Sequence, residues 1–163
     1  MPTSNNATLL RRIYEDVFTN KRLEVLDEVI AKDCVDANPL PGQAPGLQGI
    51  RESCQVWLNA FPDGRLTVEN IIADGELVCG SFRATGTHRG TLMGIQPTNK
   101  SVTMSGMDIV TVRGGKITHW RHNEDFFGML TQLGVIDADQ LMSGKVGMTG
   151  GQPKPSEARA KNR

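Results

Sequence analysis

Hydrophobic and polar residues alternate most regularly along the segment between Val102 and Val112. One face of this segment carries Val102, Met104, Gly106, Asp108, Val110 and Val112, and the other carries Thr103, Ser105, Met107, Ile109 and Thr111. A period of two residues predicts a β-strand. Gly114 and Gly115 can adopt the positive φ angles of a two-residue turn, so Ile117–His122 is predicted to return as the partner strand of a hairpin.

The N-terminal part of the chain has helical spacing instead, and the segments that follow it are extended. Apolar residues recurring at helical intervals predict helices over Asn6–Phe18, Leu23–Ile30 and Leu47–Phe61. The dense Pro and Gly residues between Pro39 and Gly46 predict a loop. Further strands are predicted over Leu66–Ile72 and Glu76–His88, and the glycines inside the second suggest bends or bulges. Helices followed by antiparallel strands are typical of an α+β domain with helices on one face of the sheet.

The length and composition indicate a single folded domain followed by a tail. A chain of 163 residues can bury a real hydrophobic core. We assign residues 1–142 to this domain. Residues 143–163 are rich in Gly, Pro, Ser and Lys and have almost no large apolar residues, so a flexible tail is predicted there.

The charge balance and the cysteine pattern exclude several classes of protein. Lys plus Arg and Asp plus Glu number 18 each, so the net charge is zero and a nucleic-acid-binding surface is not expected. No apolar run is long enough for a membrane span and no signal peptide is recognisable, so we expect a cytoplasmic protein. Cys34, Cys54 and Cys79 are widely spaced and odd in number, which favours neither a disulfide framework nor a metal site.

Two carboxylates lie among apolar residues and are therefore candidates for acid/base chemistry. Asp108 lies on the apolar face of its strand, and Asp125 directly precedes Phe126. A carboxylate in apolar surroundings is costly unless it is paired, and its pKa tends to rise. The alternatives are that Asp108 is a solvated strand residue and that Asp125 is a helix N-cap. Glu124 is a third carboxylate of interest, with His88 and His122 as helpers.

Several stretches resemble those of a known family, the SnoaL-like polyketide cyclases, also called ester cyclases. They are Trp57-Leu58-Asn59-Ala60-Phe61-Pro62-Asp63, Gly86-Thr87-His88-Arg89-Gly90 leading to Met93–Thr98, Gly114–Ile117, and Asp125-Phe126-Phe127-Gly128 leading to Gln132-Leu133-Gly134. The resemblance extends from about Leu9 to Gly134.

This resemblance implies a fold, a reaction and a catalytic residue. The fold would be a cone-shaped α+β barrel, with a strongly curved, mainly antiparallel sheet wrapped around the N-terminal helices. The reaction would be an intramolecular aldol cyclisation without a cofactor or metal. The family's general acid/base aspartate falls on Asp125. The family's Asn-Pro pair matches Asn38-Pro39, and its Gly-x-His-x-Gly run contains His88.

The sequence departs from the family at the strand before the hairpin. The family carries substrate-contacting Gln and His there, and their places fall on Gly106 and Asp108. A second carboxylate close to Asp125 would raise one of the two pKa values. A protonated Asp108 could also donate a hydrogen bond to a substrate oxygen.

The candidate catalytic residues are thus Asp125 and Asp108, and no metal or cofactor is expected. The candidate substrate-binding residues are His88, His122, Asn38, Trp57, Tyr14 and Phe126. Tyr14 has the alternative role of a core residue, because it lies beside Leu10 and Val17 on its helix.

Three functional hypotheses stay open at this point. The first is a cofactor-free enzyme that performs cyclisation or isomerisation on an apolar carbonyl or polyketide-like compound. The second is a binding protein for a small hydrophobic ligand. The third is epoxide hydrolysis by a set formed from Asp108, Arg121 and Asp125. The family also implies a homodimer or homotetramer, assembled through the sheet face that carries Thr103, Met107, Ile109 and Thr111 beside Ile117.

Overall fold

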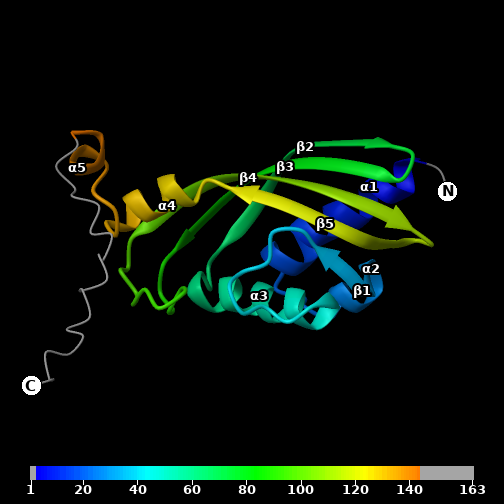
Figure 1. Cartoon of the computed structure of the whole chain (residues 1–163), viewed down its shortest axis with the longest axis horizontal. Helices are drawn as coiled ribbons and strands as arrows, with labels where there is room; N and C mark the ends of the chain where they lie inside the picture. Colours follow the sequence, from blue (N-terminus) through cyan, green and yellow to red (C-terminus); the bar gives the residue numbers. More distant parts are fainter. Residues whose placement is uncertain (1–2, 144–163) are drawn as a thin grey trace, which may run out of the picture.

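A five-stranded sheet with helices on one face forms the body of the protein (Figure 1). The computed structural model describes residues 3–143. Its elements are α1 (Thr3–Arg12), the π-helix η1 (Ile13–Thr19), α2 (Val25–Val29), β1 (Ile30–Asp36), α3 (Gly46–Ala60), β2 (Arg65–Asp74), β3 (Leu77–Thr87), β4 (Ser101–Arg113), β5 (Lys116–Glu124), α4 (Phe126–Leu133) and α5 (Ala138–Met142). The predicted α+β class with a curved, mainly antiparallel sheet around N-terminal helices is confirmed.

The strands lie in the order β1-β5-β4-β3-β2. All neighbouring strands are antiparallel except β1 and β5, which are parallel. Along β4 the inner and outer residues alternate without a break from Ser101 to Val110, as the hydrophobic pattern predicted. Gly114 and Gly115 both have positive φ, which confirms the predicted hairpin turn between β4 and β5.

The first predicted helix is really two segments of different winding. The α-helix gives way to a π-helix at Ile13, which the apolar spacing could not reveal because both windings bury one side of the chain. Tyr14 and Val17 of η1 are buried against the sheet in the main hydrophobic core. The helix α3 closes the same side of the molecule, with Ile50, Cys54 and Leu58 on its buried face.

Two glycines in the sheet make room for aromatic side chains rather than for bends. β3 pairs with β4 in continuous register, so the bulge suggested for β3 is absent there. A Cβ atom at Gly80 would lie 2.7 Å from the hydroxyl oxygen of Tyr14. A Cβ atom at Gly106 would overlap the ring of Phe82. The small residues therefore let both rings approach the inner face of the sheet.

The outer face of the sheet is partly apolar, but it differs from the expected dimer face at one residue. Met107 and Ile109 are exposed there, whereas Ile117 is completely buried because it points inward to the core. The homodimer or homotetramer stays a prediction.

The tail predicted over residues 143–163 lies outside the described residues except for Ser143. Among the residues that the structure describes, no helix combines the length and hydrophobicity needed to span a membrane.

Candidate active site

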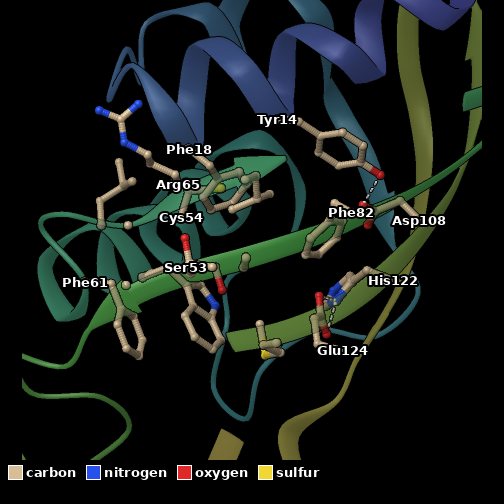
Figure 2. A pocket seen from close by; sticks show the side chains of 18 of the residues that line it. Tyr14, Phe18, Ser53, Cys54, Phe61, Arg65, Phe82, Asp108, His122 and Glu124 are labelled. Atoms are coloured by element: carbon tan, nitrogen blue, oxygen red, sulfur yellow. Dashed lines mark hydrogen bonds and ion pairs between the residues drawn. The ribbon is translucent and has the colours of Figure 1, made fainter. Parts of the chain in front are cut away.

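A cavity lies between α3, η1 and the inner face of the sheet. Its volume is about 120 Å³, several times the space of about 10–15 Å³ that a water molecule needs, so the cavity can hold an organic molecule. Its walls are mainly apolar and aromatic, and they include Phe18, Ile50, Trp57, Leu58, Phe61, Leu66, Phe82, Val102, Met104, Trp120 and Met129. Asp108, His122 and Glu124 lie together at one end of the cavity (Figure 2).

The first polar feature of the cavity is the carboxylate of Asp108, which is only 2% exposed. Its Oδ2 accepts a hydrogen bond of 2.6 Å from the Tyr14 hydroxyl, and its Oδ1 accepts one of 2.6 Å from Nε1 of Trp120. Figure 2 shows the first of these bonds. Burial raises the pKa of Asp108, the two hydrogen bonds oppose that rise, and the resulting pKa is about 6.

The second polar feature is an imidazole held between two carboxylates. Nδ1 of His122 lies 2.9 Å from Oε1 of Glu124, and its Nε2 lies 3.3 Å from Oδ1 of Asp36. The three side chains are only 20%, 16% and 10% exposed, respectively. Burial by itself lowers the pKa of His122, but the hydrogen bond and charge of Glu124 and the charges of Asp36 and Asp108 raise it to about 9. His122 is therefore an imidazolium at neutral pH.

The two polar features are adjacent, because Asp108 and His122 are register partners on β4 and β5. The positive charge of His122 lowers the pKa of Asp108 and so favours its ionised form. Cys54 also lines the cavity, but burial raises the pKa of its thiol to about 12 and keeps it protonated. Asp108, whose pKa is about 6, thus lies beside the cation of His122 on the cavity wall.

The structure brings some predicted site residues together in this cavity and leaves others outside. Asp108, Tyr14, Trp57 and His122 line the cavity. The reading of Asp108 as a solvated strand residue is wrong, because the side chain is buried and accepts two hydrogen bonds. Tyr14 is a core residue and also lines the cavity, and its role in substrate binding stays a prediction.

The remaining predicted substrate-binding residues do not line the cavity. Phe126 packs against Trp57, with ring centroids 5.7 Å apart. Asn38 is exposed, and its backbone N–H donates to Asp36. His88 is completely buried behind Phe61, and its Nδ1 accepts a hydrogen bond from the backbone N–H of Thr98. None of these three residues lines the cavity wall.

Asp125 does not face the cavity. It is exposed, and its Oδ1 accepts a hydrogen bond of 2.8 Å from the backbone N–H of Gly128, which makes it the N-cap of α4. The N-cap alternative is therefore what the structure shows. The expectation that Asp125 lies with Asp108 at one pocket is wrong, because the chain leaves β5 one residue earlier and turns the aspartate outward.

The set considered for epoxide hydrolysis is likewise not assembled. Asp108 points into the cavity, whereas Arg121 and Asp125 are exposed outside it. Side chains of neighbouring strand residues point to opposite faces, so Arg121 cannot join its neighbour His122 in the cavity.

The sequence does not point to Asp36, and it indicates Glu124 only as a third carboxylate beside Asp108 and Asp125. The alternation along β5 was a usable signal for Glu124, since Trp120, His122 and Glu124 are two residues apart and share a face. Asp36 gave no local signal, because its position beside β5 depends on the parallel pairing of β1 with that strand. Among residues 3–143, no cluster of three or more His, Cys, Asp or Glu side chains could hold a metal ion.

Comparison with known proteins finds a family and many similar structures. The model of the family described as SnoaL-like polyketide cyclase matches residues 8–133. IdmH from Streptomyces antibioticus, a proposed polyketide cyclase, is 33% identical over 79% of this chain and 98% of its own, with a TM-score of 0.68. None of the curated proteins matches the chain.

Two further solved structures resemble the chain in fold at lower identity. TsrD from Streptomyces laurentii has a TM-score of 0.77 at 18% identity, over 83% of this chain and 99% of its own. AclR from Streptomyces galilaeus, a proposed hydroxylase, has a TM-score of 0.72 at 21% identity, over the same shares of the two chains.

Proposed function

The chain belongs to the SnoaL-like polyketide cyclase family, and from that premise we propose that it catalyses a cofactor-independent aldol-type cyclisation or isomerisation of an apolar carbonyl compound. The reaction takes place in the cavity between α3 and the sheet. Asp108 is the general acid/base, in place of the Asp125 that the family resemblance suggested.

The observation that carries this proposal is a buried carboxylate, hydrogen-bonded to Tyr14 and Trp120, on the wall of an apolar cavity. A pKa of about 6 leaves Asp108 mostly ionised at neutral pH while keeping it basic enough to accept a proton. An ionised carboxylate has about four sites for accepting hydrogen bonds, and Tyr14 and Trp120 occupy two of them. The remaining sites are available to a substrate.

Asp108 alone removes the proton from the substrate and later returns it. Its carboxylate removes a proton from the carbon next to the substrate carbonyl, and the electron pair of the C–H bond forms an enolate. In a cyclisation, the enolate carbon attacks a second carbonyl of the same molecule, and the resulting alkoxide takes the proton back from Asp108. In an isomerisation, the proton returns to another carbon. No electrons are gained or lost, so the proposal requires no redox cofactor.

His122 supplies positive charge beside the reacting atoms. Negative charge moves from Asp108 to the substrate during the reaction, and a nearby imidazolium stabilises it in both places. Glu124 and Asp36 hold the imidazole ring from both sides and keep it protonated. They are therefore positioning residues in this proposal.

The test is deuterium exchange with a carbonyl probe. Ethyl benzoylacetate is an apolar β-keto ester with acidic protons, and the protein is expected to speed their exchange in heavy water, followed by NMR. The exchange rate should fall about tenfold per pH unit below about pH 6, where Asp108 becomes protonated, and should fall again above about pH 9, where His122 loses its charge.

Two outcomes would speak against this proposal. A rate no faster than in buffer, with the probe bound in the cavity, would favour the hypothesis of a ligand-binding protein. A pH profile without an acid limb near 6 would exclude Asp108 as the base.

A further inference from the structure

Two cationic residues lie at the end of the cavity away from Asp108. They are Lys21, which follows η1, and Arg65, the first residue of β2. Asp108 is paired with Gly80 on β3, and Arg65 is paired with Thr85 on the same strand. Thr85 lies five positions after Gly80, so the two ends of the cavity lie about 17 Å apart along the sheet. Figure 2 shows Arg65 on the opposite side from Asp108, His122 and Glu124.

The ammonium group of Lys21 is held in place by backbone carbonyls. Its Nζ donates to the carbonyl oxygens of Phe18 at 2.7 Å and Gly64 at 2.5 Å. An ammonium has three donors, so one N–H remains for a further acceptor. Burial lowers the pKa of Lys21; the charge of Asp63 opposes this, and the smaller effect of the Arg65 charge adds to it.

Neither cation is neutralised by an ion pair of its own. Among the described residues, no carboxylate forms a salt bridge with Lys21 or Arg65. Asp63 is near enough to raise the pKa of Lys21, but its two carboxylate oxygens accept hydrogen bonds from the backbone N–H and the hydroxyl of Thr87. Asp63 therefore keeps its charge near Lys21 but forms no salt bridge with it, so the remaining N–H of Lys21 is open to an anionic ligand, and Arg65 adds a second positive charge at this end.

The other end of the cavity would repel such an anion. It holds Asp36, Glu124 and Asp108, and only one cation, His122. An anionic group in a ligand would therefore avoid that end and lie beside Lys21 and Arg65. The wall between the two ends is apolar, with Phe18, Leu58, Phe61, Leu66, Val102 and Met104.

We propose that the substrate is an elongated apolar molecule with an anionic end group, which Lys21 and Arg65 bind while the reacting carbonyl lies beside Asp108. This inference rests on the proposed function, because it assigns the substrate class and its orientation in the same cavity. Lys21 is the fixed donor to the anion. Arg65 lies at the rim with an exposed side chain and supplies a second charge.

The test compares the binding of decanoate and decanol by isothermal titration calorimetry. The two probes share an apolar chain and differ in the charge of the end group. Decanoate is expected to bind at least about tenfold more tightly, since a hydrogen bond to a charged group contributes about that much. Added salt should weaken the binding of decanoate more than that of decanol. Decyl phosphate distinguishes a phosphate end group from a carboxylate by which of the two binds more tightly.

Variants of Lys21 and Arg65 test whether these two residues cause the preference for decanoate over decanol. Lys21→Met and Arg65→Gln should each reduce the preference for decanoate and leave decanol binding unchanged. Arg121→Gln, which removes an exposed cation on the outer face, should leave the preference intact and serves as the matched control. Lys21 also binds two backbone carbonyls, so the Arg65 variant keeps the test decisive if Lys21→Met does not fold.

Equal affinities for decanoate and decanol would overturn the inference, as would an undiminished preference in both variants. Neither probe has to react, so this failure is separate from that of the proposed function. If the protein speeds the exchange of ethyl benzoylacetate but does not prefer decanoate, only the proposed anion site is rejected and the proposed function stands.

Discussion

Replacement of Asp108 by Asn is expected to lower the exchange rate of ethyl benzoylacetate about a hundred- to ten-thousandfold, the range that general acid/base groups contribute. The amide has the shape of the carboxylate but cannot accept a proton from carbon at neutral pH. Tyr14 and Trp120 both donate to this side chain, so one of these donors loses its acceptor when a carboxylate oxygen becomes an NH₂ group. The fold is checked by circular dichroism before rates are compared.

Asp125→Asn is the matched control for this experiment. Asn is as good an N-cap as Asp, so the hydrogen bond to the Gly128 N–H and the helix α4 are preserved. Asp125 lies outside the cavity, and the exchange rate is expected to stay at the wild-type level. The family resemblance predicts the reverse order. A large loss in Asp125→Asn with little change in Asp108→Asn would return the catalytic role to Asp125.

Replacement of His122 by Gln is expected to cost about 2 kcal/mol of unfolding free energy near pH 6, after allowance for solvent screening. The cause is that Asp36 and Glu124 lose the cation between them and are left close together inside the protein. The change should also raise the pKa of Asp108 above 6, because the charge of His122 lowers it in the wild type.

The cost of this replacement should depend on pH in a defined direction. The folded-state pKa of His122 is raised from 6.5 to about 9, so its contribution is fully present below about pH 6.5 and is lost as the pH rises through 9. Urea unfolding of both proteins across this range measures the difference. His119→Gln, on the same strand but exposed, is the control and should change stability little at any pH. A cost for His122→Gln that does not shrink toward pH 9 would contradict the assignment.

The sheet could be predicted from the sequence because its signal is local. Alternation between Val102 and Val112 placed Asp108 on the inner face, and the structure agrees at each of these residues except Thr111, which is half-buried. Its partner Tyr14 was not predictable as such, because the two residues are 94 positions apart and meet only when η1 packs on the sheet. Hydrophobic periodicity gives the face of an element but not what lies opposite it.

At the end of β5, the family motif and the local strand pattern point to different acidic residues. The motif selected Asp125, whereas the period of two through Trp120 and His122 selects Glu124 as the inward residue. One position along a strand reverses the face. Asp36 required knowledge of the parallel β1–β5 pairing, which no local pattern contains. The roles of Gly80 and Gly106 could not be predicted from the sequence either, because a glycine in a strand can indicate either a bulge or the close approach of another group.

Catalysis by Asp108 requires that its side chain titrates near neutrality inside the apolar cavity. An NMR titration of the side-chain carboxyl carbons tests this requirement directly, and it needs no substrate. Comparison of the wild type with Asp108→Asn identifies its resonance. This resonance is expected to titrate with a pKa of about 6. A resonance that titrates at or below the ordinary value of about 3.9 would contradict it.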